Sequence, residues 1–139
     1  MALELNSLQK ALNALDRSLH VVGGDIDSLG EDIRETLRAE VIQNFEVAYE
    51  QCWKFVQRWI RENRTPEDAD HPRTRKELFR MAARSGLIAD PLPWFEYGDA
   101  RNLTSHTYDA KQAETVLAVA ERFIVDAQAL LLQLETHND

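Results

Sequence analysis

The stretch LRAEVIQNFEVAYEQCWKFVQRWI, residues 37–60, carries apolar side chains at helical spacing on two sides. One stripe comprises Leu37, Val41, Phe45, Ala48, Cys52, Phe55 and Trp59. The other comprises Ile42, Tyr49, Trp53, Val56 and Ile60. More than half of the helix circumference is thus apolar or aromatic, and a helix covered in this way is buried on two sides. We expect it to meet its own bundle on one side and another chain, or another helix, on the other.

A first helix is predicted upstream of this stretch. Its apolar residues recur every third or fourth position on one face, at Leu5, Leu8, Leu12, Leu15, Leu19 and Val22. Gly23-Gly24 ends the pattern. Ser28 and Glu31 then have the spacing of a capping box, in which each side chain satisfies a backbone N–H of the first turn. They predict the start of the long helix, which runs to about Arg64.

A short third helix is predicted after a polar loop. Residues 64–72 are mostly polar and contain prolines at positions 66 and 72, which is typical of a loop. Thr74 and Glu77 again have capping-box spacing, and the helix that follows should end at Gly86.

Two more helices complete the predicted bundle. Asp90 and Pro91 supply an N-cap followed by proline at the first helical position. This fourth helix should end near His106, because Asp109 caps a fifth. The fifth helix has an apolar face made by Leu117, Ala120, Ile124, Ala127, Leu131 and Leu134. Residues 1–139 therefore read as one all-α domain, an up-and-down bundle of about five helices.

The composition excludes several classes of protein. The chain has 139 residues, a net charge of −8 and a single cysteine, Cys52. A single cysteine excludes a disulfide framework and a multi-cysteine zinc module, and it is typical of a protein in a reducing cytoplasm. Cys52 lies in an apolar stripe of the long helix, which predicts a thiol in the core. No run of about 18 apolar residues and no signal-peptide pattern occurs, so we expect a soluble cytoplasmic protein without membrane contact. Its acidity restricts any nucleic-acid binding to a local surface.

Charge is distributed unevenly along the chain. Acidic residues dominate residues 25–50, at Asp25, Asp27, Glu31, Asp32, Glu35, Glu40, Glu46 and Glu50. Basic residues dominate residues 73–84, at Arg73, Arg75, Lys76, Arg80 and Arg84. The basic run is either a solvated helix face or a local patch that attracts phosphate. Composition alone does not decide between the two.

The segment from Trp94 to Asp109 is unusually polar for a bundle helix. Asn102 and His106 lie on one face, about 40° apart, whereas Arg101 and His106 lie about 140° apart on an ideal helix. The heads of Arg101 and His106 converge only if the helix frays near its end or the arginine curls back. The next helix begins immediately afterwards, and its N-terminus with Lys111 beside it favours phosphate unless the carboxylate of the cap residue occupies it.

These side chains suffice for one kind of chemistry. An imidazole near neutrality moves a proton to or from a ribose 2′-hydroxyl or a leaving 5′-oxygen. A guanidinium stabilises the extra charge of a pentacoordinate phosphorus, and an amide orients either group. Arg101, Asn102 and His106 are therefore sufficient for RNA cleavage without a metal or cofactor. They are equally sufficient for a capped helix end with a satisfied histidine.

The other candidate residues point to weaker sites. No metal site is predicted, because the remaining histidines are scattered and read as surface residues: His20, His71 and His137. Glu46 and Glu50 are four residues apart and suit acid/base work, or else face solvent or pair with Lys54.

The motif RNLTSHTY, residues 101–108, resembles the HEPN superfamily of small helical proteins, in which an arginine is followed after four to six residues by a histidine. FEVAYEQCWK, residues 45–54, resembles the aromatic-rich signature of the branch called nucleotidyltransferase substrate-binding proteins. The segments 75–80 and 86–88, followed by Trp94, also resemble that branch. The resemblance covers about residues 5 to 135.

This resemblance implies a homodimer whose partner is a minimal nucleotidyltransferase, in a toxin–antitoxin pair. Arg101 and His106 would be the catalytic pair of a metal-independent ribonuclease, supported by Asn102, with two copies in one cleft. The substrate would be RNA rather than DNA. Tyr108 stands where some members accept AMP from the antitoxin, which would place bulk and negative charge in the phosphate site.

The resemblance also admits a second function. In the older interpretation of this branch, the protein binds the substrate of its nucleotidyltransferase and cuts nothing. The intact Arg101, Asn102, His106 and Tyr108 favour the nuclease. The acidic total favours a partner-binding role, or a ribonuclease that uses only a local basic surface.

Overall fold

The structure, a computed structural model, describes residues 3–64 and 74–138. The helices are α1 (Asn6–Gly23), α2 (Glu31–Asn63), α4 (Arg75–Arg84), α5 (Leu92–Leu103) and α6 (Ala110–Thr136), and a 3₁₀ turn, η1 (Thr104–His106), continues α5. No strand occurs in these two segments, so the all-α prediction is confirmed. None of the described helices is long and apolar enough to cross a membrane.

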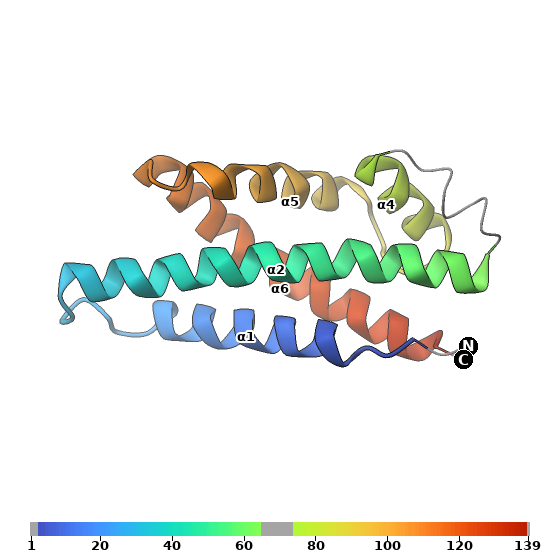
Figure 1. Cartoon of the computed structure of the whole chain (residues 1–139), viewed down its shortest axis with the longest axis horizontal. Helices are drawn as coiled ribbons and strands as arrows, with labels where there is room; N and C mark the ends of the chain where they lie inside the picture. Colours follow the sequence, from blue (N-terminus) through green and yellow to red (C-terminus); the bar gives the residue numbers. More distant parts are fainter. Residues whose placement is uncertain (1–2, 65–73, 139) are drawn as a thin grey trace.

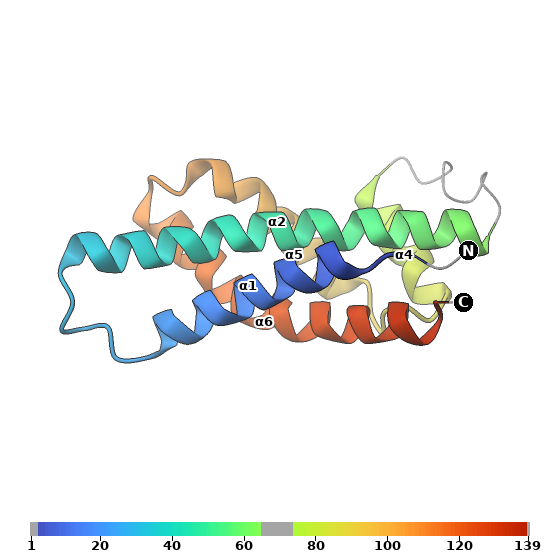
Figure 2. The same cartoon turned by 60° about the horizontal axis from the view of Figure 1, so that its bottom comes forward.

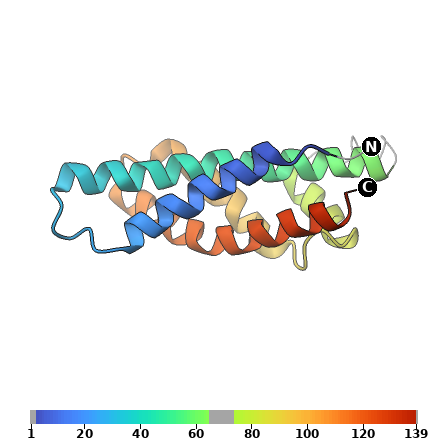
Figure 3. The ribbon, with the colours of Figure 1, turned by 90° about the horizontal axis from the view of Figure 1, so that it is seen from below.

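The long helix α2 organises the bundle (Figure 1). α1 runs along one side of α2, α4 and α5 lie along the other, and α6 crosses behind it and lies beside α1 in the turned views (Figures 2 and 3). The two ends of the chain meet at one end of the bundle. There the amide N–H of Leu3 donates to Asn138 Oδ1 over 2.6 Å, and Asn138 Nδ2 donates to the Leu3 carbonyl over 3.0 Å.

Both apolar stripes of α2 are covered by helices of the same chain. Phe45, from the first stripe, meets Phe123 of α6 edge to face with ring centroids 5.1 Å apart. Tyr49, from the second, lies 6.2 Å from Phe79 of α4. Another helix, rather than another chain, therefore covers the second side. Most residues of the two stripes are buried within this one chain.

An aromatic cluster joins four helices around Phe123 of α6. Its ring centroid lies 5.1 Å from Phe45, 5.7 Å from Trp94 and 5.3 Å from Tyr97. Trp94 in turn stacks on Phe79 at 4.9 Å, so α2, α4, α5 and α6 share one core. Buried aromatic rings at these separations attract through their edges and faces in addition to burying apolar area.

The N-caps of α4 and α6 follow the sequence signals. Thr74 Oγ1 accepts from the N–H of Glu77 over 3.2 Å, and the Asp109 carboxylate accepts from the N–H of Lys111 over 2.9 Å. α4 ends before Gly86, whose φ of +82° suits glycine, and the N–H of Leu87 then donates back to the carbonyl of Ala82 over 3.0 Å. The predicted core position of Cys52 is confirmed, and burial raises the pKa of its thiol.

Two predicted helix starts are wrong. α2 begins at Glu31 with Gly30 as its N-cap, because the N–H of Leu29 bonds to the carbonyl of Ile26 and closes a turn that leaves Ser28 outside the helix. α5 begins at Leu92, so Pro91 is the N-cap rather than the first helical residue. The Asp90 carboxylate still caps this end, since it accepts from the N–H of Leu92 over 3.0 Å.

We expect Phe123→Ala to lower the free energy of unfolding by about 3–5 kcal/mol, because it empties the point where four helices meet. Val125→Ala on the same helix is the matched control, since Val125 is 63% exposed and its loss should change stability by less than about 0.5 kcal/mol. Urea unfolding followed by circular dichroism measures both. Should Phe123→Ala fail to fold, Phe123→Leu serves in its place with a smaller loss. Equal effects at the two positions would contradict the packing described.

Candidate functional site

Arg101 lies in the last turn of α5 and reaches across to α2. Its Nε donates to Glu50 Oε1 over 2.8 Å, and its Nη2 lies 3.5 Å from Glu46 Oε1. The side chains of Arg101 and Glu50 are 27% and 20% exposed. The strong contact therefore anchors the base of the guanidinium. The longer contact to Glu46 leaves the Nη groups able to donate to another acceptor.

Thr104 links the end of α5 to the same carboxylates. Its Oγ1 lies 2.7 Å from the carbonyl of Arg101, 3.1 Å from Glu46 Oε2 and 3.5 Å from Arg101 Nη1. The regular α5 helix stops at Leu103 and tightens into η1, which contacts both α2 and α6. The helix thus departs from regular α geometry near its end, which is one of the two conditions named for the convergence of Arg101 and His106.

Glu50 is the centre of this network. Its Oε1 accepts from Arg101 and lies 3.4 Å from Arg75 Nη2, while its Oε2 accepts from Trp53 Nε1 over 2.6 Å. Burial disfavours the charge on Glu50. Hydrogen bonds from Arg101 and Trp53 and the charge of Arg75 outweigh that cost and lower the pKa of the carboxyl below its ordinary value. Glu50 is therefore ionised at neutral pH and holds both arginines.

Of the alternatives left open for Glu50, pairing with Lys54 is not the one observed. The Lys54 ammonium lies over the Trp53 ring, 5.8 Å from its centroid. Helical spacing brings Lys54 near Glu50, but the tertiary packing of α4 and α5 brings two guanidiniums closer. Glu46, with a side chain 42% exposed, is partly solvated as expected.

His106 and Tyr108 lie on the exposed turn between α5 and α6. Their rings are 6.3 Å apart with planes at 72°, and Tyr108 is 88% exposed. Tyr108 also lines a hollow of about 510 Å³ between the starts of α2 and α6. Within the described chain no hydrogen bond joins Arg101 to His106, because Arg101 turns toward α2 while His106 faces solvent.

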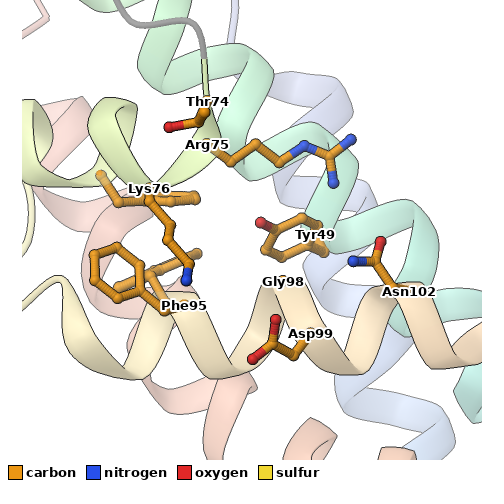
Figure 4. A pocket seen from close by; sticks show the side chains of 10 residues that line it. Tyr49, Thr74, Arg75, Lys76, Phe95, Gly98, Asp99 and Asn102 are labelled. Carbon is orange, nitrogen blue, oxygen red and sulfur yellow. The ribbon is translucent and has the colours of Figure 1, made fainter.

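Asn102 lines a different hollow, a pocket of about 390 Å³ between α4 and α5 (Figure 4). Its amide projects toward Tyr49, the Arg75 guanidinium lies on the same side of the pocket, and Lys76 stands at the opposite rim. Asn102 therefore lines this pocket and His106 does not, although the helical spacing predicts that they share one face.

The predicted basic residues are only partly brought together. Arg75 and Lys76 line the pocket, and the Arg80 guanidinium lies 5.2 Å from the centroid of the Phe95 ring in its wall. Arg84 does not line the pocket, and Arg73 lies outside the described residues. Lys111 stands at the start of α6, where the Asp109 carboxylate already accepts its N–H, so this helix end is not a free anion site.

The histidines proposed as surface residues are exposed where the structure describes them. His20 and His137 each have Nδ1 at 2.8 Å from a backbone carbonyl of their own helix, and His71 lies outside the described residues. Between residues 3–64 and 74–138 no group of three His, Cys, Asp or Glu side chains is arranged to hold a metal ion.

One close approach in the site, between Gly98 and Tyr49, is not predicted by the sequence. A Cβ on Gly98 of α5 would lie 2.9 Å from the hydroxyl oxygen of Tyr49 on α2. Gly98 therefore lets the phenol reach the floor of the pocket between α4 and α5. No local pattern indicates this contact, because it joins two helices that are distant in the sequence.

We expect Glu50→Gln to lower stability at neutral pH and to weaken its dependence on pH. The folded-state pKa of Glu50 is depressed, so its contribution is present above the ordinary value of 4.5 and is lost as the pH falls through the lower folded value. Thermal melts between pH 7 and pH 3 measure this for the wild type and the variant. Glu46→Gln is the matched control, and an equal loss in both variants would contradict the central place of Glu50.

Known proteins are similar to this chain over almost its whole length. Residues 3–136 match the family model described as nucleotidyltransferase substrate binding protein like. A protein of Haemophilus influenzae (strain ATCC 51907 / DSM 11121 / KW20 / Rd) named "Probable ribonuclease HepT" is 34% identical over 138 residues, which is 98% of this chain and 94% of the relative.

A solved structure from Haemophilus influenzae, described as the fold of a substrate binding domain of a nucleotidyltransferase, is also similar. It is 34% identical, with a TM-score of 0.89 over 95% of this chain and 99% of that one. The predicted all-helical fold and the predicted branch are both confirmed by these matches. The chain belongs to the nucleotidyltransferase substrate binding protein-like family.

Proposed function

We propose that this protein is a metal-independent endoribonuclease, with Arg101 and His106 as the catalytic pair and Asn102 in support. The observation that carries the proposal is the anchored arginine: Glu50 grips Nε over 2.8 Å, while both Nη groups have only long contacts of 3.5 Å. Such a guanidinium is fixed in place yet still able to bind phosphate. The name of the Haemophilus relative supports the same activity.

In the proposed reaction, His106 removes the proton from a ribose 2′-hydroxyl. The 2′-oxygen attacks phosphorus, the bond from phosphorus to the 5′-oxygen breaks, and the departing oxygen takes a proton from an imidazolium. Arg101 stabilises the charge that accumulates on the phosphoryl oxygens. Because Arg101 and His106 diverge within one chain, we extend the proposal to a homodimer in which Arg101 of one copy assists His106 of the other.

We further propose that the ribonuclease is the toxin of a cytoplasmic two-protein module. A minimal nucleotidyltransferase would restrain it by transferring AMP to Tyr108. The phenol oxygen attacks the α-phosphorus of ATP, pyrophosphate leaves, and the phenol proton passes to solvent. Support comes from the 88% exposure of Tyr108 and from its place 6.3 Å from the His106 ring, where an added phosphate would fill the site with bulk and charge.

The second candidate is a non-catalytic subunit that binds the substrate of a nucleotidyltransferase. The description of the solved Haemophilus structure and the pocket beside Asn102 favour it. The two functions differ in one respect that is simple to measure, because only the first requires the imidazole of His106 for turnover.

We expect purified protein to cleave total RNA in the presence of EDTA, and His106→Ala to reduce the rate by about 100- to 10,000-fold, the usual contribution of a general acid or base. His20→Ala is the matched control, because His20 is also exposed and lies at the far end of α1. Gel analysis of the RNA measures all three proteins. Background-level cleavage by the wild type and both variants would leave the substrate-binding function standing.

We expect incubation with the cognate nucleotidyltransferase and ATP to add the mass of one AMP group to the wild type and none to Tyr108→Phe. Intact-mass spectrometry measures the addition, and peptide mapping locates it. The remaining tyrosines, Tyr49 and Tyr97, are buried and serve as internal controls. An unchanged addition in Tyr108→Phe would refute the assignment of this acceptor.

A further inference from the structure

We propose that the pocket between α4 and α5 binds one nucleotide of single-stranded RNA, its base against the aromatic walls and its phosphate at Arg75 and Lys76. This inference rests on the proposed ribonuclease function, for which it supplies a substrate subsite. Figure 4 shows the pocket open above Gly98, with Lys76 and Phe95 on one side and Arg75, Tyr49 and Asn102 on the other.

The walls of the pocket suit a flat ring. Four of the side chains that line it are aromatic: Tyr49, Phe79, Trp94 and Phe95. Phe79 and Trp94 are almost fully buried and stack on one another at 4.9 Å, so this part of the wall is held rigidly by the core. A volume of about 390 Å³ falls within the range of ligand pockets. Phe95 is the partly exposed ring among the four, and unstacked RNA bases bind on exposed aromatic faces.

The rim of the pocket carries positive charge. The Lys76 ammonium lies 5.6 Å from the centroid of the Phe95 ring, and no ion pair with Lys76 occurs among the described residues. The Arg75 guanidinium lies 5.5 Å from the centroid of the Tyr49 ring. Asp99 is the one acidic side chain in the lining and is exposed, so it is placed to accept from a sugar hydroxyl or a base amino group.

Aromatic walls beside cations define the chemical class of the ligand. A phosphate alone makes no use of the aromatic surface, and an aromatic peptide side chain makes no use of Lys76. A nucleotide uses both, because it joins a flat ring to an anion. The chain as a whole is acidic, with a net charge of −8, so a phosphate group is attracted to this local cationic rim rather than to the rest of the surface.

Tyr49 provides a polar group at the floor of the pocket. Its hydroxyl is reached over the bare backbone of Gly98, where a Cβ would stand only 2.9 Å away. Burial raises the pKa of Tyr49 to about 12, although the nearby Arg75 acts in the opposite direction. The phenol is therefore protonated at neutral pH and able to donate a hydrogen bond to a carbonyl or ring nitrogen of a base.

The pocket is joined directly to the Arg101 network. Arg75, at the rim, lies 3.4 Å from the same Glu50 Oε1 that accepts from Arg101 over 2.8 Å. Asn102, in the lining, follows Arg101 in α5. A nucleotide in the pocket would thus place its neighbouring phosphate beside Arg101. A duplex does not offer its bases in this way, so the pocket would select unpaired RNA.

The test is a calorimetric titration of the full-length protein with 5′-AMP, adenosine and inorganic phosphate in turn. We expect saturable binding of AMP, and binding at least about tenfold weaker for adenosine and for phosphate. No saturable binding of AMP at millimolar concentration would overturn the proposal. Phosphate that binds as tightly as AMP would also overturn it, because the aromatic walls would then contribute nothing.

Two variants locate the binding. Lys76→Ala should weaken AMP binding about tenfold, which is the loss of one charge-assisted contact, whereas Arg84→Ala on the same helix should leave it unchanged. Gly98→Ala should weaken it as well, because the added methyl group covers the Tyr49 hydroxyl. Thermal melts establish that each variant is folded. Equal losses in Lys76→Ala and Arg84→Ala would overturn the assignment to this pocket.

Competition separates this inference from the proposed function. A short single-stranded RNA should displace AMP from His106→Ala, which keeps the pocket, while the matching duplex should not. AMP binding without such displacement would assign the pocket to free nucleotide and overturn the RNA subsite. Wild-type cleavage of RNA without any AMP binding would overturn this inference alone, and displacement without wild-type cleavage would overturn the ribonuclease alone.

Discussion

Burial of α2 on both sides by its own chain is the constraint on which the rest of the structure depends. Phe45 and Tyr49 belong to different stripes of α2, and both pack against Phe123 of α6. Phe79 and Trp94 extend the same core into α4 and α5. These rings hold α5 against α6 and α2. The position of Arg101 beside Glu50 is therefore a consequence of how the aromatic core packs.

Electrostatics then divides the candidate site into three parts. Glu50 holds Arg101 and Arg75 together, because an ionised carboxylate that is mostly removed from water is stable only with strong donors around it. Asn102 opens onto the pocket between α4 and α5 on one side of this pair. On the other side, His106 and Tyr108 stand exposed on the turn before α6. The two guanidiniums are thus fixed at the centre, and the imidazole and the phenol are exposed at the edge.

Local signals in the sequence succeeded where the deciding contact lies within one turn of helix. Thr74 and Asp109 cap their helices as the spacing predicts, since their partners are only two or three residues away. Ser28 does not cap α2 as predicted, because a backbone turn at Leu29 moves the start of the helix to Glu31. That turn has no side-chain signature in the sequence. The alternative that Glu50 pairs with Lys54 does not occur for a different reason. Helical spacing identifies which residues are near in one helix, whereas the partners of Glu50 come from two other helices.

The sequence by itself determined the helices, the two-sided burial of α2 and the chemical types gathered in residues 94–109, because each depends on residue spacing within one helix or turn. The tertiary structure alone decided which helix covers the second side of α2, which carboxylate holds Arg101, and how Gly98 and Tyr49 form the floor of a pocket. Those outcomes depend on side chains that are tens of residues apart. Their separation in space is set by the packing of the core, which no periodicity along the chain encodes.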